Sequence, residues 1–92
     1  MFVRVERRQG IRPRAPVRLI FTLVESSRND GHVRTRKLAY LGVIHADALR
    51  YVECRRRVWV SAEKALASLK LDQGTADAVR AQLERHVPRA AD

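Results

Sequence analysis

The sequence predicts an α+β protein, in which an N-terminal antiparallel β-sheet of two to three strands is followed by two α-helices. Branched and aromatic residues alternate or run together in the first half of the chain, as is typical of strands. The dipeptide Asp30-Gly31 lies between two such runs and is a strong β-hairpin signal. From Ala46 onward, apolar residues recur at spacings of three, four or seven, which indicates helices.

The length of 92 residues and a hydrophobic share of 46% predict one small folded domain. We expect this domain to span residues 1–88. It divides into a β-hairpin half, residues 1–45, and a helical half, residues 46–88. Residues 89–92 are expected to form a frayed tail.

The first elements are two strands joined by a basic loop. Residues 2–7 alternate loosely between apolar and charged side chains, which predicts a short strand. Residues 8–16 contain a glycine and two prolines, which exclude a helix or a central strand, so we expect a loop or arm. Residues 17–26 are the best strand candidate in the chain because they are rich in branched and aromatic residues.

The return strand of the hairpin is predicted at residues 33–41 and ends at Gly42. A two-residue turn at Asp30-Gly31 implies the pairs Asn29 with His32, Glu25 with Arg36, Leu23 with Leu38 and Phe21 with Tyr40. One face of the hairpin then carries an apolar set that we assign to the core: Leu19, Phe21, Leu23, Leu38 and Tyr40. The same face becomes polar toward the turn.

Two amphipathic helices are predicted in the second half. The first runs over about residues 48–70 with Asp47 as its N-cap, and its apolar stripe consists of Leu49, Val52, Trp59, Ala62, Leu66 and Leu69. Trp59 is assigned to the core because it lies on this stripe. The second helix runs over about residues 75–87, with Ala76, Val79, Leu83 and Val87 on one face, and Pro88 discourages its continuation.

The charge is strongly positive and unevenly distributed. The chain has 19 Lys and Arg against 10 Asp and Glu, a net charge of +9. Residues 1–46 have ten basic groups against three acids, a net of +7, whereas residues 47–92 have nine against seven, a net of +2. Such an asymmetry favours an N-terminal half that faces a polyanion.

Several other classes of protein are disfavoured. Cys54 is a single cysteine and cannot form an internal disulfide, and no apolar run reaches the ~18 residues of a membrane span. His32, His45 and His86 lie apart without ligand spacing, so we expect no metal site. The lack of an internal disulfide and of a membrane span favours a cytoplasmic protein. No phosphate-binding loop, nucleophile elbow or paired-carboxylate motif occurs, so we expect a protein that is not an enzyme and needs no cofactor.

The basic hairpin and loop predict a nucleic-acid-binding module. A two-stranded ribbon fits the DNA major groove, and alternate side chains can reach bases and phosphates. Arg34 and Arg36 share one face, and Lys37 lies on the other. The full set of candidate contacts is Arg7, Arg8, Arg12, Arg14, Arg28, Arg34, Arg36 and Lys37.

Duplex DNA is the favoured partner, with the protein then associated with the bacterial nucleoid. RNA is disfavoured because assigning Phe21 and Tyr40 to the core leaves few aromatic side chains for base stacking. A different class of function remains open. The helical half could serve as a protein–protein interaction or oligomerisation module, for example in a homodimer. No membrane partner is expected.

Residues 23–42 resemble the N-terminal hairpin of some DDE-type insertion-sequence transposases. The resemblance rests on Val24-Glu25-Ser26, Arg28, Gly31, Arg34, Arg36, Leu38 and Leu41-Gly42. The whole chain is also similar to small uncharacterised proteobacterial proteins that share this hairpin, a helix with a tryptophan and a terminal Val-Pro. The resemblance implies association with nucleic acid, as a remnant or accessory of a mobile element, and implies no cleavage activity.

Overall fold

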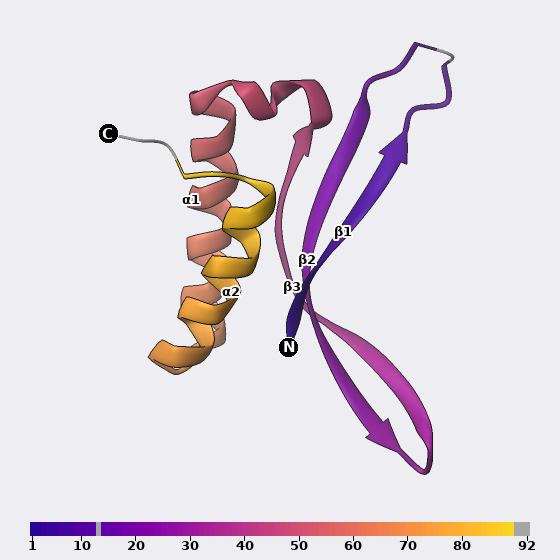
Figure 1. Cartoon of the computed structure of the whole chain (residues 1–92), viewed down its shortest axis with the longest axis vertical. Helices are drawn as coiled ribbons and strands as arrows, with labels where there is room; N and C mark the ends of the chain where they lie inside the picture. Colours follow the sequence, from indigo (N-terminus) through magenta and orange to yellow (C-terminus); the bar gives the residue numbers. More distant parts are fainter. Residues whose placement is uncertain (13, 90–92) are drawn as a thin grey trace.

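The computed structural model describes residues 1–12 and 14–89, with Asn29 described by its backbone alone, and it confirms the α+β class. Strands β1 (Phe2–Gln9), β2 (Val17–Asn29) and β3 (His32–His45) form one antiparallel sheet in the order β1-β2-β3. The short 3₁₀ helix η1 (Ala46–Arg50) leads to helices α1 (Val52–Leu69) and α2 (Gln73–His86). Both helices cover the same face of the sheet, so the molecule has two layers (Figure 1).

The predicted hairpin turn is confirmed. Asp30 has a φ of 51° and Gly31 a φ of 80°, which are the positive values of a two-residue type I′ turn. The strands pair through Asn29 with His32 and Glu25 with Arg36, as expected. Both strands are longer than predicted, because β2 stays paired up to the turn and β3 stays paired beyond its predicted end. The predicted stop at Gly42 is wrong, since Gly42 pairs with Phe21 and the strand continues to His45.

The pairing predicted farther from the turn is wrong. Leu23 pairs with Ala39 rather than Leu38, and Phe21 pairs with Gly42 rather than Tyr40. The register shifts between Leu23 and Val24 and again between Phe21 and Thr22. Each shift is a β-bulge, in which an additional β3 residue stands opposite the continuous strand β2.

The bulge at Leu38 exchanges the faces of β3 and the bulge at Leu41 restores them, because successive side chains on a strand point to opposite sides. Only the residues between the two bulges are therefore moved to the other face. Tyr40, assigned to the core by the sequence, pairs with Thr22 and is 53% exposed on the face away from the helices. Leu41 and Ile44 are buried instead, and Leu38 is half-buried. The rest of the predicted core face is correct, with Phe21 and Leu23 fully buried and Leu19 half-buried.

The first predicted helix is divided into two parts. Asp47 lies inside η1 and is not the N-cap of α1, which begins after Tyr51 in an extended conformation. The guanidinium of Arg55 stabilises this junction by donating to the Leu49 carbonyl oxygen at 2.6 Å. Helix α2 begins at Gln73, because the Asp72 carboxylate accepts from the Thr75 backbone N–H at 3.1 Å and caps the helix.

The core lies between the sheet and the two helices. Its buried residues are Phe21, Leu23, Leu41 and Ile44 from the sheet, Val58, Trp59, Ala62 and Leu66 from α1, and Val79, Leu83 and Val87 from the C-terminal segment. At Gly42 a Cβ would lie 3.2 Å from Val58, so the glycine allows α1 to approach the sheet closely. Trp59 is buried as predicted and donates from Nε1 to the Val87 carbonyl oxygen at 3.0 Å.

The chain after α2 is held near α1. Arg55 Nε donates to the Pro88 carbonyl oxygen at 3.1 Å, and the Arg89 guanidinium lies 4.0 Å from the centre of the Trp59 ring. The expectation of a frayed tail at residues 89–92 therefore does not describe Arg89. Residues 90–92 lie outside the described part of the chain.

Candidate nucleic-acid interface

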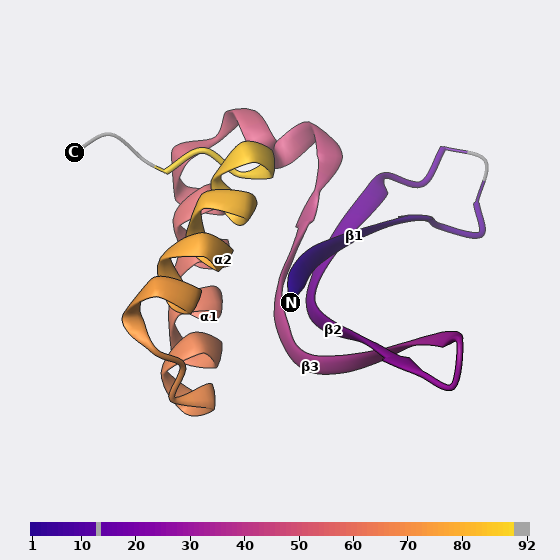
Figure 2. The same ribbon diagram turned by 60° about the horizontal axis from the view of Figure 1, so that its bottom comes forward.

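Two basic segments project on the side of the sheet away from the helices. One is the loop between β1 and β2, described at residues 10–12 and 14–16 and here called loop 10–16, and the other is the end of the β2–β3 hairpin. The sheet curls so that both segments bend in the same direction, and its uncovered face, here called the outer face, is concave between them (Figure 2). The fold therefore brings together two arginine-bearing segments that are separated in sequence.

The hairpin end, here called the ribbon, consists of residues 25–37, including the turn at Asp30-Gly31. It extends beyond the β1–β2 pairing, which ends at Val24, so it is a two-stranded element. Every described side chain in the ribbon is exposed. It carries four cations, which are Arg28, Arg34, Arg36 and Lys37, against two carboxylates, which are Glu25 and Asp30.

The register assigns the ribbon cations to two faces. Arg34 is opposite Ser27 and Arg36 is opposite Glu25, which places both arginines on one face as predicted. Lys37, opposite Val24, and Arg28, opposite Val33, lie on the other face. The Arg36 Nη2 is 3.5 Å from the Glu25 carboxylate, but the arginine side chain is 78% exposed, so this ion pair contributes little to stability.

Loop 10–16 carries Arg12 and Arg14, both exposed. The Ala15 N–H donates to the Arg12 carbonyl oxygen at 3.0 Å and closes a tight turn. The predicted loop began two residues earlier, but Arg8 and Gln9 belong to β1, where Arg8 pairs with Arg18. The strand continues because β2 begins at Val17 and supplies partners for both residues.

Arg7 and Arg8 lie on opposite faces of the sheet. Arg7 pairs with Leu19 on the helix side, whereas Arg8 pairs with Arg18 on the outer face. The eight predicted contact residues therefore do not form one continuous surface. The outer face and its two flanking segments combine Arg8, Arg12, Arg14, Arg28 and Lys37.

Besides the predicted Arg8 and Lys37, the outer face contains four functional candidates that the sequence analysis missed, which are Arg4, Arg18, Glu6 and Tyr40. Paired residues across the sheet place Arg4, Arg8, Arg18 and Lys37 on this face, together with Glu6 and Tyr40. The Glu6 carboxylate lies 3.3 Å from the Arg4 guanidinium and 3.5 Å from that of Arg8. The alternation of Arg4, Glu6 and Arg8 could have indicated a charged strand face, but the exposure of Tyr40 depends on the bulges.

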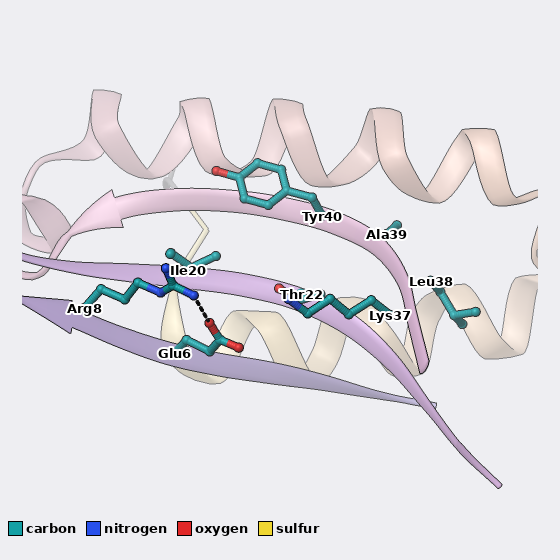
Figure 3. Close-up of a pocket in the computed structure, with 8 residues that line it drawn as sticks. All are labelled: Glu6, Arg8, Ile20, Thr22, Lys37, Leu38, Ala39 and Tyr40. Atoms are coloured by element: carbon teal, nitrogen blue, oxygen red, sulfur yellow. Dashed lines mark hydrogen bonds and ion pairs between the residues drawn. The ribbon is translucent and has the colours of Figure 1, made fainter. Parts of the chain in front are cut away.

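A shallow hollow of about 360 Å³ lies on the outer face (Figure 3). Ile20 and Thr22 of β2 line its floor, Leu38 and Ala39 line it along β3, and the Tyr40 ring stands at the β3 side. Arg8 and Glu6 border it on the β1 side. The hollow thus combines an apolar floor, an exposed aromatic ring and a charged border.

The apolar stripe of α1 packs against other elements of the same chain. Val58, Trp59, Ala62 and Leu66 are buried against the sheet and α2, while Val52, which was predicted to belong to the stripe, is 39% exposed at the start of the helix. The suggested homodimer through the helices would have to use other residues, such as the exposed Val60.

Other chemical groups lie apart from this interface. Among the described residues, no group of three or more His, Cys, Asp or Glu side chains could hold a metal ion. Cys54 is a free, half-buried cysteine on α1. The described helices include none with the length and apolar character needed to cross a membrane.

No protein-family profile, curated protein or solved structure matches this chain. The transposase-like hairpin therefore stays a prediction from the residues at positions 23–42.

Proposed function

We propose that the protein binds nucleic acid, with duplex DNA as its main partner, and that the ribbon enters the major groove. The observation that carries this proposal is the ribbon itself, a two-stranded element whose described side chains are exposed and which carries four cations against two acids. A major groove is about 12 Å wide and admits a two-stranded ribbon.

The division of cations between the ribbon faces suits this mode of binding. Arg34 and Arg36 share one face, from which planar guanidinium groups can donate two hydrogen bonds to a guanine edge. Lys37 and Arg28 lie on the opposite face and can reach phosphates on the groove wall. Loop 10–16, which bends in the same direction as the ribbon, supplies Arg12 and Arg14 as a second phosphate contact.

The resemblance of residues 23–42 to transposase N-terminal hairpins supports the same class of partner. We propose a binding role without catalysis, as an accessory or remnant of a mobile element that associates with the bacterial nucleoid.

The test compares two double variants on duplexes enriched from a random-sequence pool. Arg34→Ala with Arg36→Ala removes two ribbon charges, and Arg57→Ala with Lys64→Ala removes two exposed charges from α1, on the other side of the sheet. Groove entry predicts that the ribbon variant loses about 2–4 kcal/mol more binding free energy, measured by fluorescence anisotropy, because each lost base contact is worth about 1–3 kcal/mol.

Arg57 and Lys64 are a better control than residues of α2. Arg80 on α2 donates to Glu63 and Asp77 at 2.9 Å each, so replacing it would disturb the packing of the helices. Circular dichroism checks that both variants are folded. Equal losses from the two folded variants would contradict groove entry, and no binding of any duplex at low salt would contradict the proposed function.

A further inference from the structure

The outer face of the sheet has a feature that groove binding by the ribbon does not use. Tyr40 is 53% exposed at the edge of the hollow, next to a floor lined by Ile20 and Thr22. Among the described residues no helix covers this face, since α1 and α2 both pack on the opposite side (Figures 1 and 2). An exposed aromatic ring beside an apolar floor favours a flat, partly apolar ligand.

The charges around the hollow determine which flat ligand fits. The outer face carries Arg4, Arg8, Arg18 and Lys37 against Glu6, and Arg8 and Lys37 directly line the hollow. Basic segments flank the face at both ends, the ribbon on one side and loop 10–16 on the other (Figure 2). A ligand with a flat ring and linked negative charges matches this arrangement, and a nucleotide within a strand has both.

We propose that the hollow holds an unpaired base of a nucleic-acid strand, stacked on Tyr40, with the adjoining phosphates between Arg8 and Lys37. Bases inside a duplex are stacked on one another and cannot lie on a protein ring, so the base must come from a single-stranded segment. Glu6 lies 3.5 Å from Arg8 and helps to position its guanidinium group at the border of the hollow.

This inference rests on the proposed function and narrows its substrate. The ribbon would hold duplex DNA while the outer face, continuous with the ribbon through β2 and β3, holds an unpaired segment next to it. The substrate class is therefore a duplex with an adjoining single strand. The exposure of Tyr40 also removes part of the reason for which RNA was disfavoured from the sequence alone, since of the two aromatic residues assigned to the core only Phe21 is buried there.

The test measures the affinity of the wild-type chain for three probes that share one duplex. The first is blunt, the second has a single-stranded overhang of about six nucleotides, and the third has an abasic overhang of equal length and charge. Overhangs at the 3′ and 5′ ends are both tested. We expect the overhang with bases to bind about 5- to 150-fold more tightly than the abasic one, the range for loss of one base–aromatic stack.

Variants assign this difference to the hollow. Tyr40→Ala is expected to abolish the preference for bases over abasic sites and to leave blunt-duplex affinity unchanged, whereas Tyr40→Phe retains the preference. Tyr51→Ala is the matched control, because Tyr51 is 52% exposed and lies outside the hollow, at the start of α1. It should behave like the wild type.

The results separate this inference from the proposed function. Binding of the blunt duplex with no preference for the base-containing overhang would overturn the stacking site and leave duplex binding intact. A preference that survives Tyr40→Ala in a folded variant would place the base elsewhere and would also overturn the inference. Loss of all binding, including that of the blunt duplex, would instead contradict the proposed function.

Discussion

Glu63 connects the two helices and the chain that follows them. Its carboxylate accepts from Arg80 through two hydrogen bonds, at 2.9 Å from Nε and 3.0 Å from Nη2, and from Arg89 Nη2 at 3.0 Å. Hydrogen bonding and charge attraction from Arg80, assisted by Arg89, lower the pKa of Glu63 despite partial burial, which acts in the opposite direction. The pair of helices is thus held by an ionised group.

This pKa shift predicts an acid-sensitive contribution to stability. Because folding lowers the pKa of Glu63, the stabilisation is complete above the ordinary glutamate pKa and is lost as the pH falls through the lowered, folded-state value. Glu63→Gln should therefore lower the melting temperature at neutral pH, and its loss of stability between neutral pH and about pH 3 should be smaller than that of the wild type.

Thermal unfolding followed by circular dichroism measures both quantities. Some acid sensitivity will persist in the variant, because hydrogen bonds from Thr75 also lower the pKa of Asp72. Glu84→Gln is the matched control, since Glu84 is an exposed carboxylate on α2. If Glu63→Gln lost as much stability in acid as the wild type, the role given to the carboxylate would be wrong.

The turn of the ribbon depends on backbone conformations that L-residues rarely adopt. Asp30 and Gly31 both have positive φ values, and a Cβ added at Gly31 would meet no atom within 4 Å. A substitution at Gly31 is therefore costly through its backbone conformation and not through a clash.

Gly31→Ala should destabilise the ribbon by about 1 kcal/mol, which corresponds to about fivefold faster amide hydrogen exchange in its paired residues. Exchange in the core strands should change little, because the ribbon lies outside the three-stranded region. Gly74→Ala is the control, since a Cβ in this first turn of α2 would make an ordinary contact with Asp72 at 3.5 Å. Unchanged ribbon exchange in Gly31→Ala would show that the turn does not limit the ribbon's stability.

In the molecule as a whole, the apolar core and the exposed arginines of the ribbon and loop 10–16 lie in different regions. The helices and the inner face of the sheet form the apolar core, while the ribbon and loop 10–16 bend away from it with exposed arginines (Figure 2). Cations at the two ends of a concave face can contact phosphates along one stretch of nucleic acid at the same time. Binding should therefore depend on several phosphate contacts at once.

We predict that duplex affinity falls steeply with salt. About four to six phosphate contacts give a slope of roughly −4 to −5 in a plot of log affinity against log salt concentration. Fluorescence anisotropy over a salt series measures the slope. An affinity that is the same at low and physiological salt would exclude an electrostatic interface of this kind.

Local patterns in the chain were sufficient to predict the fold class, the turn at Asp30-Gly31 and the pairing of Glu25 with Arg36. They also predicted the burial of Trp59 and of the second helix's apolar face at Val79 and Leu83. These features depend on residues that are close in sequence, such as a turn dipeptide or a helical repeat, so their physical cause is contained in a short segment. The same local patterns were sufficient to predict the cationic ribbon around the turn.

Only the tertiary structure decided which side of β3 faces the core and how the basic segments are combined. Between the bulges at Leu38 and Leu41 the faces of the strand are exchanged, so Tyr40 is exposed, while the additional residue Leu41 is buried. A strand with a bulge has no distinct local pattern, since the additional residue is accommodated only when β2 and α1 are packed against it. The curvature that brings loop 10–16 and the ribbon to one concave face arises in the same way, from contacts between segments distant in sequence.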